Sequence, residues 1–209
     1  QWEAKVARDL SDVVFDNVFP LLVRSLPQHD RDRPDVIGDD YLEEVRSAAL
    51  MLLYRLLFIL YAEDRNLLPD ERGPYARYCL TRMRMEIADA REGGVCPSER
   101  STEYWSRLET IFGAIAEGDD QLGIPPYNGG LFDPSNAPLL GRVRLPDSVT
   151  GEIIFLLSHR VASPAHPRPR YINYRDLSVQ QLGSIYESIL EYAVEADALG
   201  GRAAGQAGH

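Results

Sequence analysis

Lysine is nearly absent from this chain of 209 residues, in which Lys5 is the only one. A magnesium nuclease of the Pro-Asp…(Asp/Glu)-x-Lys type needs two acidic metal ligands and a lysine that orients the attacking water. The triplet Glu3-Ala4-Lys5 has half of that motif, but the acidic partner would have to lie before Gln1. The stretch also favours a helix where the motif needs a strand. We therefore interpret the match as coincidence.

Cysteine and histidine are also scarce. Cys79 and Cys96 form no Cys-x-x-Cys pair and are too few for a disulfide framework, which favours free thiols in a cytoplasmic protein. None of the histidines has a partner at metal-ligand spacing; they are His29, His159, His166 and His209. His159 is expected near the end of a helix, where a cation suits the helix dipole.

A membrane-spanning run is also missing. The longest apolar stretch, residues 48–62, is interrupted by Arg55 and falls short of the roughly 20 residues that cross a bilayer. Acidic residues flank it on both sides. This pattern predicts a central helix buried on most sides, and no membrane partner.

Positive charge is in deficit overall but concentrated in one stretch. The net charge of -10 opposes nonspecific attraction to phosphates. Residues 142–175 nevertheless carry a charge of +4, so the rest of the chain carries -14. The arginines of this stretch are Arg142, Arg144, Arg160, Arg168, Arg170 and Arg175, against Asp147 and Glu152. We take Arg160, Arg168, Arg170 and Arg175 as candidate DNA-contact residues; the alternative is a solvated surface, or pairing with acidic helices.

The spacing of apolar residues predicts a mainly α fold, an irregular bundle of about six helices with little or no strand. The expected helices cover residues 1–26 (with a kink or break at Pro20), 39–66, 74–90, a segment from 101, 147–160, and a segment from 178. In the last of these, Ser178 and Gln181 fit a capping box, and residues 179, 182, 185, 189 and 193 form the buried stripe. Residues 163–169 should be hairpin-like. We expect a domain over 1–198 and a Gly/Ala-rich tail over 199–209, and we interpret the chain as a piece of a longer protein.

Residues 118–146, rich in Gly, Pro and Asn, should form a long ordered loop that Leu131 and Phe132 anchor beside the central helix. Within it, Pro125-Pro126-Tyr127 resembles the (Asn/Asp/Ser)-Pro-Pro-Tyr element of adenine methyltransferases, but Ile124 in the first position cannot accept a hydrogen bond. We interpret these residues as a turn. Residues 128–130, Asn-Gly-Gly, should form a tight reversal with positive φ.

Three passages together resemble a known family. They are residues 53–69 (LYRLLFILYAEDRNLLP), residues 127–132 (YNGGLF), and residues 172–177 (INYRDL) running into 182–187 (LGSIYE). Their order and spacing resemble the helical region just upstream of the methyltransferase domain in fused type II restriction-modification enzymes and related phage-defence methyltransferases.

The resemblance implies a parent enzyme that methylates adenine N6 in DNA with S-adenosylmethionine, often with an N-terminal nuclease that needs a metal such as Mg²⁺. The Gly-rich cofactor turn and the Asn-Pro-Pro-Tyr element are missing from this chain, so no catalytic, cofactor-binding or metal-binding residue carries over. We therefore expect a non-catalytic connector that positions the flanking nuclease and methyltransferase domains on double-stranded DNA. The alternative is a free-standing helical protein-interaction module. A hydrolase is a third reading, but no set of acid, base and nucleophile supports it.

Overall fold

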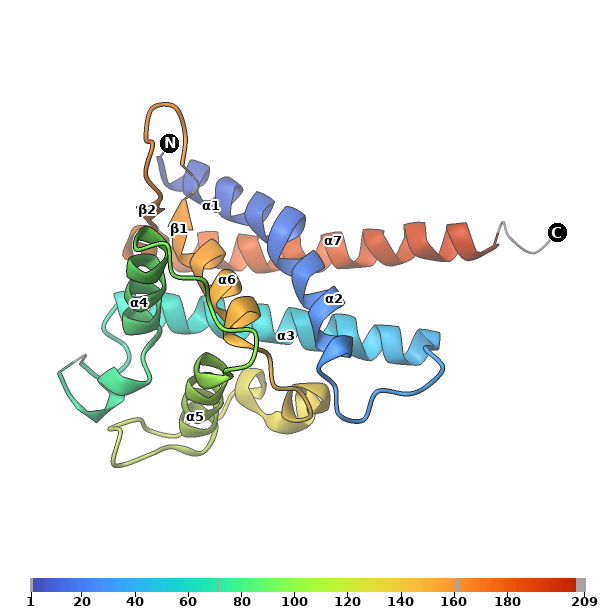
Figure 1. Cartoon of the computed structure of the whole chain (residues 1–209), viewed down its shortest axis with the longest axis horizontal. Coiled ribbons are helices and arrows are strands. Elements are labelled where there is room, and N and C mark those ends of the chain that lie inside the picture. The colour runs from blue at the N-terminus through green and yellow to red at the C-terminus, as the bar shows by residue number, and fades with distance from the viewer. Residues whose placement is uncertain (1, 71, 161, 206–209) are drawn as a thin grey trace.

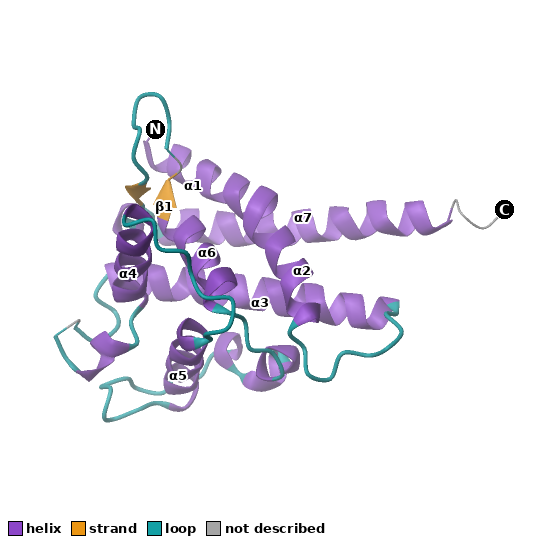
Figure 2. Cartoon of the chain, in the orientation of Figure 1, coloured by secondary structure: helices purple, strands orange, loops and turns teal. Residues whose placement is uncertain are grey.

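The computed structural model describes the backbone of residues 2–70, 72–160 and 162–205, and side chains within 4–70, 72–160 and 162–195. The fold is mainly helical, as predicted, with 66% of the residues in helices. The one sheet of the described part has two short strands (Figure 2).

The first helix is continuous but bends in its middle (Figure 1). It consists of α1 (Trp2–Val13), a π-helical turn (Val14–Val18) and α2 (Phe19–Gln28). In the π turn the Phe19 N–H donates to the carbonyl of Val14, five residues back. The wider turn directly precedes Pro20, which has no N–H to donate to a preceding carbonyl. The kink expected at Pro20 is therefore present.

The central helix α3 (Asp39–Asp64) is surrounded by the other elements. Apolar side chains on most of its sides are buried, among them Leu52, Leu53, Leu56, Leu57, Ile59 and Leu60. By length and composition alone α3 could cross a membrane, yet 67% of its most apolar window is buried inside the fold. The core helix of a globular fold can be both apolar enough to cross a membrane and mostly buried by its neighbours.

The helix predicted over residues 74–90 is instead two elements. A 3₁₀ turn (Pro74–Arg77) comes first, and α4 (Leu80–Glu92) begins after Cys79, whose backbone is extended. The reason lies in α3, because the Glu63 carboxylate accepts hydrogen bonds from the N–H groups of Leu80 and Thr81 at 2.9 and 2.7 Å. Glu63 thus caps α4 from a distant part of the chain.

Two further helices, α5 (Glu103–Glu117) and α6 (Asp147–Ser158), complete the body on the side of α4. The segment between them contains three 3₁₀ turns, Gly130–Phe132, Pro134–Asn136 and Pro138–Gly141. Phe132 is buried and Leu131 half-buried, so the loop is anchored as predicted. The anchor is α3, because the Arg55 guanidinium donates to the carbonyls of Leu131 and Asp133 at 2.7 and 3.2 Å.

Positive φ was predicted for the wrong residues of this loop. Gly129 has φ of -95°, and the positive-φ glycines of the loop are Gly118 and Gly123. Gly129 is needed for space instead, because a Cβ there would lie 2.4 Å from the Tyr127 ring. The Asn-Gly-Gly run feeds a 3₁₀ turn rather than a tight reversal.

The last helix, α7 (Val179–Gly205), runs along the length of the molecule (Figure 1). The predicted capping box is present: Ser178 N–H donates to Gln181 Oε1 at 2.9 Å, and Gln181 N–H donates to Ser178 Oγ at 3.1 Å. The predicted stripe is buried except for Val179, which is 71% exposed. The helix continues to Gly205, so no structural break marks the boundary expected at residue 199; residues 206–209 lie outside the described part.

Candidate nucleic-acid interface

The positive stretch of the sequence contains a β-hairpin that extends from one end of the body (Figure 1). Strand β1 (His159–Arg160) follows α6 directly and pairs antiparallel with β2 (Arg170–Tyr171). At the tip Ser163 and His166 exchange two backbone hydrogen bonds of 2.8 Å. The expected hairpin is thus confirmed, and α6 ends two residues earlier than predicted because His159 and Arg160 join the ladder.

The structure separates the six arginines of the stretch rather than gathering them. Arg142 lies near the other end of α6, where its guanidinium contacts Asp30 at 3.1 Å and Glu44 at 2.9 Å. The side-chain hydrogen bond to Asp30, followed by the one to Glu44, raises the pKa of Arg142. Arg144 is exposed beside it. These two arginines belong to the packing of the 118–146 loop and not to the hairpin.

Two of the four candidate DNA-contact arginines hold parts of the fold together. Arg160 forms an ion pair with Asp9 at 3.0 Å, which ties β1 to α1. Arg175 donates from Nε to the backbone carbonyl of Asp64 at 2.9 Å, at the C-terminal end of α3, where carbonyls lack helical partners. These contacts match the alternative reading for Arg160 and Arg175, in which arginines pair within the fold.

The other two candidates, Arg168 and Arg170, present their charge to solvent on the hairpin. The Arg168 side chain is 87% exposed and reaches Glu92 of α4 at 3.6 Å. An ion pair this exposed contributes little stability. Arg170 is exposed, and no ion pair joins it to a residue that the structure describes.

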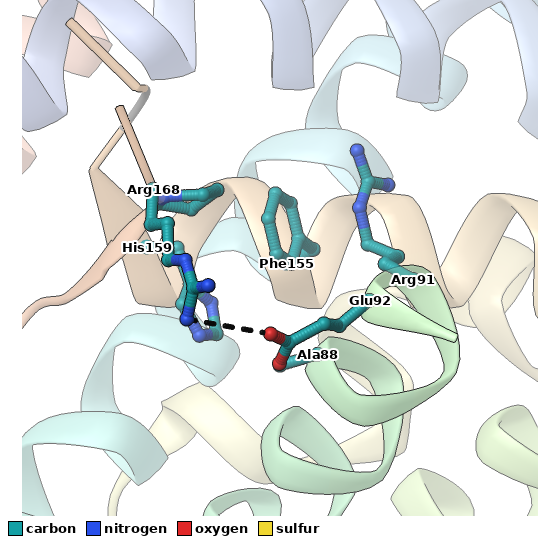
Figure 3. A pocket seen from close by; sticks show the side chains of 7 residues that line it. Ala88, Arg91, Glu92, Phe155, His159 and Arg168 are labelled. Carbon is teal, nitrogen blue, oxygen red and sulfur yellow. Dashed lines mark ion pairs between the residues drawn. The ribbon is translucent and has the colours of Figure 1, made fainter. Parts of the chain in front are cut away.

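A cavity of about 410 Å³ lies between the hairpin, α4 and α6 (Figure 3). The Phe155 ring stacks on His159 at 4.6 Å between centroids, and the Arg91 guanidinium lies 3.9 Å from the centre of the same ring. The ion pair between Arg168 and Glu92 stands at the edge of this cavity. The cavity therefore has an aromatic wall, formed by Phe155 and His159.

His159 lies at the C-terminal end of α6, as expected, where its backbone N–H donates to the carbonyl of Phe155. The residue follows α6 in extended conformation, its ring is buried, and Nδ1 lies 2.9 Å from Ser158 Oγ. Burial lowers the pKa of His159, and the positive charges of Arg84 and Arg91 act in the same direction. The hydrogen bond with the backbone of Phe155, at the end of α6, opposes this lowering.

A buried arginine of α4 lies under the hairpin. Arg84 is 3% exposed, pairs with Asp64 at 2.9 Å, and its guanidinium lies 3.5 Å from the centre of the Tyr171 ring. Burial lowers its pKa, which the carboxylate of Asp64 opposes. The contact with Tyr171 connects β2 to α4.

The passages that carry the family resemblance are joined to one another through α3. Asp64 accepts a hydrogen bond from the Tyr174 N–H at 2.8 Å, and Arg65 donates to the carbonyl of Leu177. Tyr186, in residues 182–187, and Tyr54 of α3 each donate from the hydroxyl to the backbone carbonyl of the other, at 3.4 and 3.2 Å. These motif residues thus make structural contacts.

The residues of the Pro-Pro-Tyr element pack against α5 and α3. Its Tyr127 N–H donates to the carbonyl of Ile115 in α5 at 2.9 Å, and its ring packs against Phe58 at 5.6 Å between centroids. A Cβ on Gly118 would lie 2.9 Å from Pro126, so Pro126 packs tightly against the end of α5. This agrees with a turn.

The residues present do not fit S-adenosylmethionine. The Gly-rich run at 128–130 follows no strand, and the three-residue 3₁₀ turn that it leads into offers no helix N-terminus for an anion. Within the described residues no group of three His, Cys, Asp or Glu side chains could hold a metal ion.

No family model, curated protein or solved structure matches the chain.

Proposed function

We propose that this chain is a non-catalytic helical connector of a cytoplasmic restriction-modification enzyme, a DNA methyltransferase specific for adenine N6. In that enzyme it sets the spacing of the nuclease and methyltransferase domains on double-stranded DNA. S-Adenosylmethionine, and Mg²⁺ where a nuclease is present, belong to those flanking domains. The motif resemblance supports the parent enzyme, and one structural observation supports the contact with DNA.

That observation is the exposure of Arg168 and Arg170 on a projecting hairpin. Most other guanidiniums of the stretch are bound within the fold, and the chain as a whole repels a polyanion. Two accessible arginines on a protrusion can reach backbone phosphates without bringing the acidic body against the duplex. Such contacts fix position on DNA and carry no base specificity.

This contact is tested by measuring the affinity of the protein for duplex DNA at several salt concentrations. Each phosphate contact contributes about 0.9 to the slope of log affinity against log salt, so R168Q/R170Q should flatten the slope by roughly two. The matched control R24Q/R144Q removes the same charge from exposed arginines outside the hairpin. If both double variants keep the wild-type slope, the proposed contact between the hairpin and DNA is contradicted.

The parent enzyme is tested separately from the contact. We expect the native coding sequence to continue beyond residue 209 into a domain with a Gly-rich cofactor turn and an Asn-Pro-Pro-Tyr element. Incubated with labelled S-adenosylmethionine and adenine-containing duplex, the 209-residue chain should transfer no methyl group above background. Methyl incorporation would overturn the non-catalytic assignment.

A protein-interaction module is a second candidate, because α7 has exposed apolar side chains. Leu190 is 53% and Val194 62% exposed, four residues apart on one face of the helix. Glu187, Glu191 and Glu195 form an acidic row beside them. A coding sequence that ends near residue 209, combined with unchanged salt slopes, would favour this module over the connector.

A further inference from the structure

A second hollow lies on the other side of the hairpin, between the hairpin and α1, with a volume of about 420 Å³. Its apolar floor includes Val6, Leu10 and Ile172. Its charged lining consists of Lys5, Arg160 and Arg170 together with a single carboxylate, that of Asp9. With histidines counted as neutral, the lining carries a net charge of +2 in a protein whose net charge is -10.

The sheet register places two of these cations against each other. Arg160 and Arg170 are direct partners across the two strands, so their side chains leave the same face of the ladder. Like charges in this position destabilise a strand pair. Asp9 is bound to Arg160, and no ion pair joins Arg170 or Lys5 to a residue that the structure describes. An anion between the strands and α1 would remove this repulsion.

The arrangement of donors fits a phosphate group better than a carboxylate. Cations come from three separate segments, α1, β1 and β2, and the tip of the hairpin adds Ser163 and His166. A tetrahedral phosphate has oxygens for several directions, whereas a planar carboxylate presents two. The apolar floor and the volume also leave room for an organic group attached to the phosphate.

We propose that the hollow between α1 and the hairpin binds the phosphate of a nucleotide unit, free or within a nucleic-acid strand. Lys5 and Arg170 contact the phosphate, and the apolar side chains of α1 contact the attached sugar or base. The identification of a DNA strand as the ligand rests on the proposed function. The existence of a phosphate site in this hollow does not. In this proposal Lys5, which forms part of the Glu3-Ala4-Lys5 triplet, contacts the ligand from helix α1 and has no part in a nuclease motif.

The single lysine gives this site its own probe. Reductive methylation of the full chain with ¹³C-formaldehyde labels Lys5 and the N-terminal amine, and keeps the positive charge of both. The Lys5 methyl resonance is then followed during titration with inorganic phosphate, adenosine monophosphate and a short DNA duplex. We expect a saturable shift with adenosine monophosphate, at lower concentration than with phosphate alone.

Substitution separates the site from general electrostatics. R170Q retains the Lys5 probe and should weaken the nucleotide affinity about tenfold, which corresponds to one charged hydrogen bond. R24Q removes an equal charge from exposed α2 and should leave the affinity unchanged. The proposal is overturned if none of the three ligands gives a saturable shift, or if R170Q and R24Q behave alike.

The three titrations also distinguish this proposal from the DNA function. A shift with the nucleotide but not with the duplex supports the site and contradicts a strand as its ligand. A shift with the duplex that R170Q weakens supports both. Arg168 does not line this hollow. If substitution of Arg168 leaves the salt dependence of DNA binding unchanged, the proposed DNA contact is contradicted. The nucleotide titration then still tests the phosphate site.

Discussion

Glu63 illustrates how single side chains fix the course of the chain. Its carboxylate accepts four hydrogen bonds of 2.7 to 2.9 Å, from the Tyr75 hydroxyl, from two N–H groups at the start of α4, and from the Thr81 hydroxyl. Burial raises its pKa, and the hydrogen bonds oppose this. Glu63 thus closes the connection between α3 and α4, in addition to the local cap in which Cys79 Sγ accepts from the Arg82 N–H.

Replacement of Glu63 by alanine should lower the free energy of unfolding by about 2 to 3 kcal/mol. The variant leaves N–H donors at the start of α4 without an acceptor, which adds to the loss of a cap. Urea denaturation measures the change. E117A, at an exposed residue at the end of α5, serves as the control and should change stability by less than about 0.5 kcal/mol. Equal effects of the two substitutions would contradict the capping role.

Gly113 within α5 and Gly118 directly after it should respond to alanine in opposite directions. Gly118 has φ of 81° and ψ of 154°, and a Cβ there would also meet Pro126. G118A should therefore destabilise the protein by about 1 to 3 kcal/mol. Gly113 lies inside the helix with open space around it, so G113A should stabilise by about 0.5 to 1 kcal/mol. Thermal unfolding of both variants checks the signs, and a stabilised G118A would disprove the strain.

At the level of elements, the helices could be predicted where one apolar face repeats along the chain, as in α5 and α7. The interruption at Cys79 could not, because its cause is Glu63, sixteen residues earlier. Nor could the placement of the arginines: sequence spacing groups Arg142 with Arg170, whereas the 12 residues of α6 separate them in space. The hollow beside α1 was missed for the same reason, since Lys5 lies far from the hairpin in sequence.

The junction of the hairpin with α6 should make stability depend on pH through His159. Its folded pKa lies below the unfolded value of 6.5, so the unfolded chain binds a proton first as the pH falls. The stability contribution is complete above pH 6.5 and is lost as the pH falls toward the folded pKa. Urea unfolding at several pH values should show this loss in wild type and less of it in H159Q. H166Q, at an exposed histidine of the hairpin, should follow wild type; a wild-type pH profile in H159Q would contradict the assignment.

Over the whole molecule, α3 is the element on which the others depend. It contacts α2, α4, α6 and α7 as well as three of the 3₁₀ turns, and the motif passages are bonded to it. The far end of α7, in contrast, extends past the other helices (Figure 1). We therefore expect a core that opens only by global unfolding and a helical extension that opens locally.

Hydrogen exchange should reveal this gradient directly. We expect amides in the middle of α3 to exchange slowest and those of α7 beyond residue 196 to exchange much faster, because that end of the helix extends past the other helices (Figure 1). L53A, at a side chain with no exposed surface, should lower the protection of the slowest amides by about 2 to 5 kcal/mol, since a core cavity destabilises the whole folded state. L190A, on the exposed face of α7, should leave them unchanged. Protection at the end of α7 equal to that of α3 would show instead that the whole helix is part of the core.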